Sequence, residues 1–255
     1  MRGGRPAVLA AAVARRFNGV PGTGTWINDE RQGPLVVLLM IETMVTGLVD
    51  AISYLELGHV FVANMTGNVV FLGLAVADTQ EFSVAASLAA MAAFLVGALA
   101  GGRLGVTAGQ HRARLLAIST IVNISLLSIA LAAELLVPRD GFLYLYALIV
   151  LLAVAMGMQN AVARRLAVPD MTTTVLTLTL TGIAADSALA GGKNPHPGRR
   201  VSAALVMFFG AAIGALLIFK SGIASVLMLA IFLLFVTALA ACRAASSTAA
   251  WTAAA

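Results

Sequence analysis

The chain has 255 residues, of which 60% are hydrophobic and only 11% charged, and its mean hydropathy is +0.98. A soluble domain carries about 25% charged residues, so this composition excludes an ordinary soluble protein. The formal net charge of +5 does not indicate nucleic-acid binding, because basic residues of membrane proteins collect in cytoplasmic loops. The single cysteine, Cys242, excludes an intramolecular disulfide and a thiolate metal cluster.

Residues 1–33 precede the first long apolar segment and are predicted to form a cytoplasmic tail. Their start, MRGGRPAVLAAAVARR, has the basic-then-apolar order of a secretion signal. The apolar run is short and Ala-rich, however, and Arg15 and Arg16 follow it directly. The Ala-rich residues 243–255 are predicted to form a second cytoplasmic tail.

Eight apolar segments lie between these tails. Most approach the ~20 residues that a helix needs to cross about 30 Å of hydrocarbon. The predicted class is therefore an all-α polytopic membrane protein with a single transmembrane domain, residues 34–242. The segments cover residues 34–56, 58–77, 83–102, 115–137, 142–163, 168–189, 201–219 and 222–242.

The charges between the segments distinguish two topologies. If all eight segments span from a cytoplasmic N-terminus, ten Lys and Arg residues lie inside and six outside. If the second and sixth segments enter and leave on one side, fourteen lie inside, and only Arg139 and Lys220 lie outside. The positive-inside rule favours this second arrangement, six full spans plus two broken or re-entrant segments, over eight spans. Broken backbone at membrane depth needs protein or a water-filled cavity around it.

Three ordered matches indicate a two-fold internal repeat, with halves at about 34–137 and 142–242. Residues 47–51 (GLVDA) match 157–161 (GMQNA), and 65–68 (MTGN) match 176–179 (LTLT). The pair Gly97 and Gly101 matches Gly210 and Gly214, and both pairs are expected at close helix–helix contacts. Halves with three spans each are inverted, as in several transporters, whereas halves with four spans are parallel.

The first segment carries a polar stripe. Glu42, Thr46, Asp50 and Ser53 follow one another at spacings of four, four and three residues, which places them on one helix face. Ionisable groups at this depth are costly, about 2.5–3.5 kcal/mol each, and should face the bundle interior or water. One interpretation is cation or proton handling, with Glu42 as a coupling carboxylate. The other is hydrogen bonding that only holds the helices together.

The second segment interrupts its apolar run with Asn64, Thr66, Gly67 and Asn68. Glycine permits non-helical backbone, and a helix that restarts here points unsatisfied N–H groups into the protein. Such an end attracts an anionic group, while the side-chain amides and freed carbonyls suit either a polar solute or a desolvated cation. The sixth segment repeats the pattern with threonines, among them Thr174 and Thr177. A continuous helix whose Asn and Thr side chains bond to neighbours is the alternative.

Gln159 and Asn160 occupy the positions in the fifth segment that Val49 and Asp50 have in the first, although a helix cap also explains Asn160. No catalytic residue, metal site or cofactor is predicted, because the three histidines lack ligand spacing and no hydrolase motif occurs. Tyr144 and Tyr146 are expected in an outer aromatic belt, and Glu134 is assigned no role. The predicted binding set comprises Glu42, Asp50, Asn64, Thr66, Asn68, Gln159, Asn160, Thr174 and Thr177.

The stretches 47–51, 61–68 and 157–161, followed by TTVLT at 173–177, resemble the YoaK-type family of bacterial inner-membrane proteins. That family is catalogued as a domain of unknown function, and the resemblance covers about residues 35–242. One departure is Leu178, where the family pattern has glycine. The resemblance implies a location in the bacterial cytoplasmic membrane and no established substrate.

Two functions remain open at the level of the sequence. The first is a small-solute or ion transporter or channel, with a polar site between the first, second, fifth and sixth segments. The second is a non-transporting membrane protein, an assembly partner or sensor, whose polar residues are structural. The expected partners are the lipid bilayer and an unidentified small solute or ion, homo-oligomerisation is left open, and neither an enzyme nor nucleic-acid binding is expected.

Overall fold

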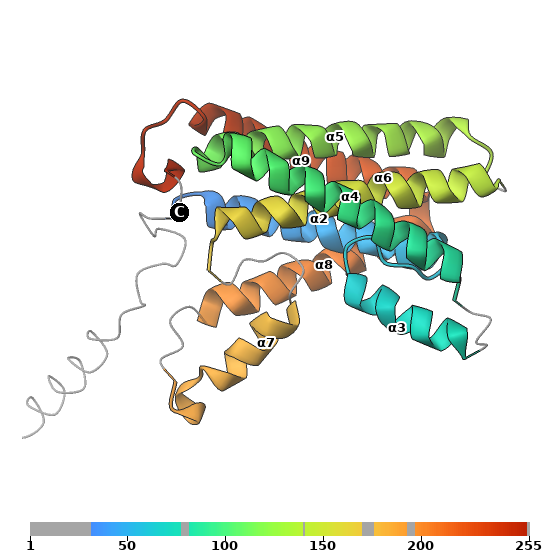
Figure 1. Ribbon diagram of the computed structural model, residues 1–255, viewed down its shortest axis with the longest axis horizontal. Coiled ribbons are helices and arrows are strands. Elements are labelled where there is room, and N and C mark those ends of the chain that lie inside the picture. Colours follow the sequence, from blue (N-terminus) through green and yellow to red (C-terminus); the bar gives the residue numbers. More distant parts are fainter. Residues whose placement is uncertain (1–31, 78–81, 140, 170–175, 193–196, 254–255) are drawn as a thin grey trace, which may run out of the picture.

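The computed structural model describes residues 32–77, 82–139, 141–169, 176–192 and 197–253, and these are helical with short connections (Figure 1). Six long helices and two short ones account for most of them. The long helices are α2 (Leu35–Glu56), α4 (Val84–Ala108), α5 (Arg112–Leu136), α6 (Phe142–Leu166), α8 (Pro197–Ser221) and α9 (Ile223–Ala244). The short helices are α3 (Met65–Val76) and α7 (Leu176–Ala185), and single 3₁₀ turns lie at Ala188–Ala190 and Ala250–Thr252.

Helix length separates the two kinds. The six long helices have 22 to 25 residues, which at 1.5 Å per residue is enough to cross a membrane. α3 has 12 residues and α7 has 10, so each reaches only about half of that depth. The all-α polytopic class is confirmed, and the described residues have the six-plus-two arrangement rather than eight full spans.

The direction of the chain shows where the short helices belong. α2 ends and α4 begins at the same end of the bundle, and α3 lies between them near that end (Figure 1). α6 ends and α8 begins at the opposite end, with α7 beside it (Figure 1). Each short helix therefore starts towards the middle of the bundle and returns to the end from which the chain came.

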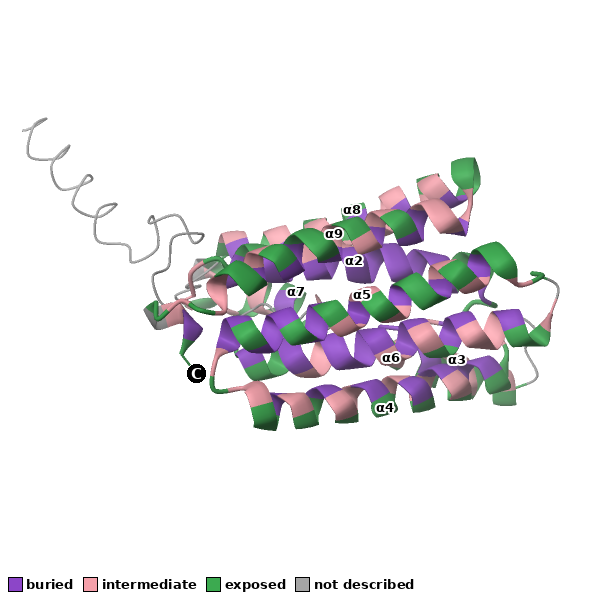
Figure 2. Ribbon diagram, turned by 90° about the horizontal axis from the view of Figure 1, so that it is seen from above, coloured by how far each residue is buried: buried purple, intermediate pink, exposed green. Residues whose placement is uncertain are grey.

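α2 lies at the centre of the bundle and is the most buried of the long helices (Figure 2). Its polar stripe is buried as predicted, with Glu42, Thr46, Asp50 and Ser53 each at most 6% exposed. The outer helices expose leucine, valine and phenylalanine side chains, the surface that a hydrocarbon environment requires.

Two glycine-lined crossings hold the long helices together. A Cβ on Gly97 of α4 would lie 2.0 Å from the carbonyl oxygen of Val154, and one on Gly157 of α6 would lie 2.0 Å from that of Phe94. At the other crossing, Gly47 of α2 and Gly210 of α8 approach the backbone of the opposite helix in the same way. The prediction that glycines mark close helix contacts is confirmed.

The helix pairs correspond across the two predicted halves. α2 packs on α8 and α9, and α6 packs on α4 and α5. α3 packs on α4, and α7 packs on α8, while α5 packs on α9. When α2–α5 are exchanged with α6–α9, α5–α9 maps onto itself and each of the other pairs becomes another observed pair, which is consistent with duplicated halves; the repeat itself stays a prediction.

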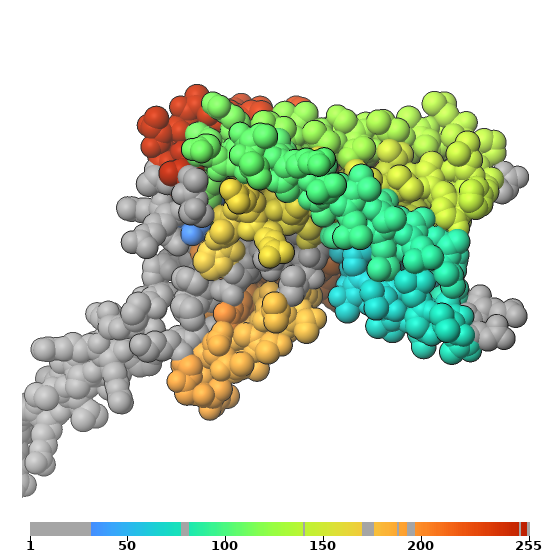
Figure 3. All heavy atoms as spheres, in the orientation of Figure 1, coloured from blue at the N-terminus to red at the C-terminus, as the bar shows by residue number. Residues whose placement is uncertain are grey.

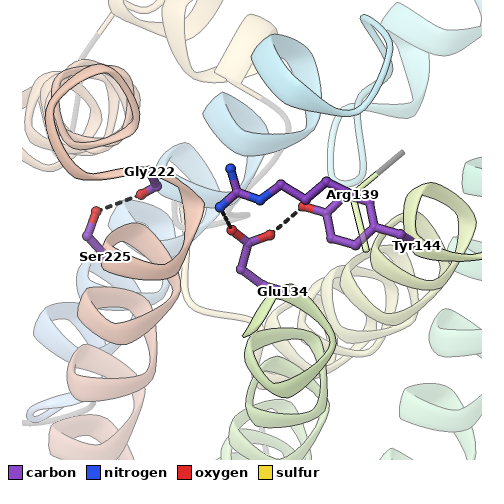
Figure 4. Close-up of polar contacts among 5 residues, drawn as sticks. All are labelled: Glu134, Arg139, Tyr144, Gly222 and Ser225. Atoms are coloured by element: carbon purple, nitrogen blue, oxygen red, sulfur yellow. Dashed lines mark hydrogen bonds and ion pairs between the residues drawn. The ribbon is translucent and has the colours of Figure 1, made fainter. Parts of the chain in front are cut away.

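A polar cluster of the buried Glu134 and Tyr144 and the exposed Arg139 lies at the end of the bundle where α5 meets α6. Glu134 of α5 accepts hydrogen bonds from the Arg139 guanidinium and from the Tyr144 hydroxyl of α6, and Gly222 and Ser225 lie nearby (Figure 4). Tyr144 is only 4% exposed, so its place in an outer aromatic belt was predicted wrongly. The hydroxyl turns inward because a buried carboxylate needs a donor.

Candidate functional site

The connection between α2 and α3 is the irregular backbone predicted in the second segment. Residues 57–64 are non-helical, and the turn is made by Gly58 and His59, both with positive φ. Asn64 precedes the first helical residue of α3, Met65, so the chain becomes helical again in the middle of the sequence motif.

Two of the predicted site residues hold this connection in place. Asp50 of α2 accepts a hydrogen bond at Oδ1 from the amide of Ala63, at 3.0 Å. Asn68 of α3 pairs with the backbone of Phe61 in both directions, accepting from its N–H at 2.8 Å and donating to its carbonyl at 2.6 Å. Both side chains are buried, so they position the connection and do not line a cavity.

Aromatic rings pack over the same connection. Phe61 stacks on Tyr54 of α2 and on Phe71 of α3, with ring centroids 5.3 and 5.6 Å away, and the Tyr54 and Phe71 rings also contact each other at 6.3 Å. Phe71 in turn stacks on Phe82 at 4.5 Å. Gly67 makes this packing possible, because a Cβ there would lie 2.5 Å from the Phe61 ring.

A cavity of about 690 Å³ lies beside the first turn of α3. Its described lining includes a residue of α7 and one of α4, and none of the lining residues is charged. We call it the α3–α7 cavity. Figure 3 shows α3 and α7 on the same face of the molecule. The lining residues are Phe61, Ala63, Asn64, Met65, Thr66, Gly67, Val70, Phe71, Phe94 and Thr177.

The first turn of α3 gives this cavity its electrostatic character. The first N–H groups of a helix have no partner within the helix, and the helix dipole adds partial positive charge there. Asn64, at the N-cap position, makes no side-chain hydrogen bond to these groups. The hydroxyls of Thr66 and Thr177 are the further donors, so the arrangement suits an anionic or hydrogen-bond-accepting solute.

The other end of α7 is held by a charged contact. Arg200 of α8 donates to the carbonyl of Gly182 and to the carboxylate of Asp186, each at 2.6 Å. A guanidinium at a helix C-terminus stabilises the last carbonyls and the negative end of the dipole. α7 is therefore anchored away from the cavity, and Thr177, in the first part of α7 that the structure describes, lines the cavity.

Glu42 and Gln159 lie in a separate place, among the long helices. Glu42 Oε1 accepts from the Thr120 hydroxyl of α5 at 2.9 Å. The Gln159 amide of α6 donates to the Glu42 carbonyl at 3.0 Å and to the Thr46 hydroxyl at 2.9 Å. These contacts join α2, α5 and α6 in the buried interior.

The predicted binding set thus falls into separate groups. Asn64, Thr66 and Thr177 line the cavity, while Asp50 and Asn68 lie behind it. Glu42 and Gln159 belong to the buried polar contacts among α2, α5 and α6. The Asn160 amide donates to the carbonyl of Met156, one turn earlier in α6. Thr174 lies outside the described residues.

Sequence reasoning missed several contributors. Phe61, Phe71 and Phe94 line the cavity, but apolar residues in an apolar chain give no signal of their own. Thr120 was detectable, because it lies three residues before Asn123, on one helix face.

With this geometry described, the chain can be compared with known proteins. Residues 38–240 match the family model described as "Protein of unknown function (DUF1275)". The chain belongs to this family. It is also 35% identical over 149 residues to the UPF0700 transmembrane protein YoaK of Bacillus subtilis (strain 168). The match covers 58% of this chain and 65% of that relative, slightly less than two thirds of its length.

The predicted resemblance to the YoaK-type family is confirmed by these matches. Neither description names an enzymatic activity. No solved structure matches the chain significantly. Membership establishes a transmembrane protein of a family without an assigned function, so any function has to be argued from the site.

Proposed function

We propose that this protein is a transporter or channel of the bacterial inner membrane for a small solute with an anionic or hydrogen-bond-accepting group. The observation that carries the proposal is the α3–α7 cavity, in which Thr66, from the first turn of α3, and Thr177, from the first described residues of α7, line one space. Discontinuous helices that direct their N-termini at a common site are typical of secondary transporters.

The lining supports the choice of solute. No described lining residue carries a charge, so recognition rests on hydroxyls, the Asn64 amide and first-turn N–H groups. These groups donate hydrogen bonds and attract negative charge, whereas a cation would meet no carboxylate among the described lining residues. The phenylalanine walls lower the local dielectric and strengthen these interactions.

The predicted duplication relates the two short helices that line the cavity. Thr66 and Thr177 are equivalent in the repeat, and so are Asn68 and Thr179. Among the described residues, Asn68 is the buried residue of α3 and Thr179 that of α7. The corresponding helix pairs agree with halves of three spans each, and three spans make the second half inverted, an arrangement that permits alternating access.

The rival function, a non-transporting membrane protein, has one observation in its favour. Asp50 and Asn68 both bond to the backbone of the connection before α3, which is a structural role. The two functions differ in whether water and solutes reach Thr66 and Thr177.

Cysteine modification tests the proposal without knowledge of the solute. In a Cys242→Ser background, Thr66→Cys, Thr177→Cys and the loop reference Gln110→Cys are treated with anionic and cationic methanethiosulfonate reagents. The measured quantity is the ratio of the anionic to the cationic modification rate. This ratio should be about 3- to 30-fold higher at positions 66 and 177 than at position 110, since each helix end contributes about 0.3–1 kcal/mol.

Matched controls lie beside each test position. Val69 is 56% exposed and Leu178 is 68% exposed, yet neither lines the cavity. Val69→Cys and Leu178→Cys should face lipid and resist both water-soluble reagents. If positions 66 and 177 are as unreactive as these controls, the bundle is closed and the rival function is correct.

A further inference from the structure

Polar side chains from four helices occupy one depth of the bundle. Glu42 of α2 lies seven residues from the start of its helix, and Thr120 lies eight from the start of α5. Gln159 of α6 and Thr237 of α9 each lie seven residues before the end of their helices. Since these four helix ends lie together, all four residues are roughly 10–12 Å from that end of the bundle.

Several polar atoms at or near this depth have no hydrogen-bond partner among the described residues. At roughly 10–12 Å from the bundle end they are Glu42 Oε2, Gln159 Oε1 and Thr237 Oγ1, and one turn deeper, on the same face of α5 as Thr120, they are both amide atoms of Asn123. Each residue is at most 3% exposed, so water outside the bundle does not satisfy these atoms. Buried polar atoms are normally paired, and a concentration of exceptions marks a missing partner.

We propose that these residues bind one dehydrated monovalent cation, for which Na⁺ is the probe. The ligands are carboxylate, amide and hydroxyl oxygens, the donors that hard cations prefer. We call this set the Glu42 cluster: Glu42, Thr46, Thr120, Asn123, Gln159 and Thr237.

The charge balance fixes the valence of the ion. Glu42 is the carboxylate of the cluster, and no described residue forms an ion pair with it. One cation of charge +1 neutralises it, whereas a divalent ion would leave an uncompensated charge in a low-dielectric interior. Consistently, among the described residues no group of three His, Cys, Asp or Glu side chains is placed to hold a metal ion.

The cluster is separate from the α3–α7 cavity. Asp50, which holds the connection beside the cavity, lies eight residues after Glu42 on the same stripe of α2, about 12 Å away. Cation binding at the cluster therefore stands whether or not the cavity conducts a solute. The two sites are joined by one rigid helix.

Direct binding of ²²Na⁺ to the purified full-length protein in detergent tests the proposal. We expect saturable binding of one ion, together with a saturable rise in melting temperature when choline is replaced by Na⁺ at constant ionic strength. Glu42→Gln should abolish both effects. Asn123→Ala, which keeps the carboxylate but removes an oxygen ligand, should weaken binding by about tenfold or more, and it provides the test if Glu42→Gln does not fold.

Glu134→Gln is the matched control, because it removes a buried carboxylate at the opposite end of the bundle. This variant should keep the ²²Na⁺ binding of the wild-type chain, even if its melting temperature is lower. Absence of saturable binding in the wild-type protein, with equal melting temperatures in Na⁺ and choline, would overturn the proposal and leave Glu42 as a protonated, purely structural side chain. Binding that survives Glu42→Gln unchanged would overturn it equally.

Discussion

At the scale of single residues, Gly67 allows the Phe61 ring of the non-helical connection to pack against the first turn of α3. The Phe61 ring lies directly over the first turn of α3 and packs in one aromatic group with Tyr54 and Phe71. A ring held by two neighbouring rings has little room to move aside for an added methyl group. Gly67 therefore leaves space for packing, while its neighbours Thr66 and Asn68 supply the polar groups.

Replacing Gly67 by alanine should disturb the cavity. The new Cβ would lie 2.5 Å from the Phe61 ring, which forces the ring or the helix to shift and costs about 1–3 kcal/mol. We expect a lower melting temperature in detergent and a changed rate of modification at Thr66→Cys. Gly73→Ala is the control on the same helix, since its Cβ meets open space and should leave both measurements nearly unchanged or slightly raise stability.

At the scale of the helices, the long ones gain stability from close backbone contact and the short ones from specific polar contacts. Lipid offers no hydrophobic driving force between helices, so small residues at crossings let the backbones pack by dispersion. α4 and α6 cross at Gly97 and Gly157, where each glycine faces a carbonyl of the other helix. α3 and α7 bury little, and depend on Asn68 and Arg200.

Gly97→Ala should therefore destabilise the protein strongly for a one-carbon change. Its Cβ would lie 2.0 Å from the Val154 carbonyl oxygen, a backbone atom that cannot rotate away, so about 1–3 kcal/mol or more is expected. The measurement is the melting temperature in detergent. Gly102→Ala, on the same helix with open space around its Cβ, should cause little change, and equal losses in the two variants would contradict the crossing.

The sequence predicted the long helices well because hydropathy over twenty residues reports burial in lipid directly. It also indicated the break before α3 from Asn64, Gly67 and Asn68, although a continuous helix with these side chains bonded to neighbouring helices was the alternative. The partners of these residues could not be predicted. Asp50 bonds to the Ala63 amide and Asn68 to the Phe61 backbone, and backbone groups have no sequence signature.

Unpredictable tertiary partners also explain why the sequence indicated one polar site where the structure has two separate ones. Glu42 and Asp50 share one face of α2, so the sequence indicated one site. Their partners lie on different elements, Thr120 on α5 and Ala63 in the connection, and only the tertiary arrangement separates them. Glu134 was assigned no role because it lies near a helix end and close to Arg139, and its contact with Tyr144 could not be predicted because that contact depends on how α5 packs against α6.

At the scale of the whole molecule, the basic residues divide the bundle into two ends. One end holds the last residues of α4, α6 and α9 and the first residues of α5 and α8. Among the described residues it carries Arg103, Arg112, Arg114, Arg164, Arg165, Arg199, Arg200 and Arg243, while Arg139 and Lys220 lie at the other end. The positive-inside rule predicts that the arginine-rich end faces the cytoplasm.

Cysteines at helix connections should report this orientation in intact cells of a Cys242→Ser strain. If α3 and α7 turn back within the membrane, Gln110→Cys and Leu189→Cys lie on the cytoplasmic side and Pro138→Cys on the outside. An impermeant maleimide should then label only position 138 until the cells are opened. All three positions are exposed, so accessibility does not limit the reaction. With eight full spans, positions 138 and 189 would both lie on the cytoplasmic side and position 110 would face outward. Labelling of position 110 alone in intact cells would therefore contradict the half-helix arrangement.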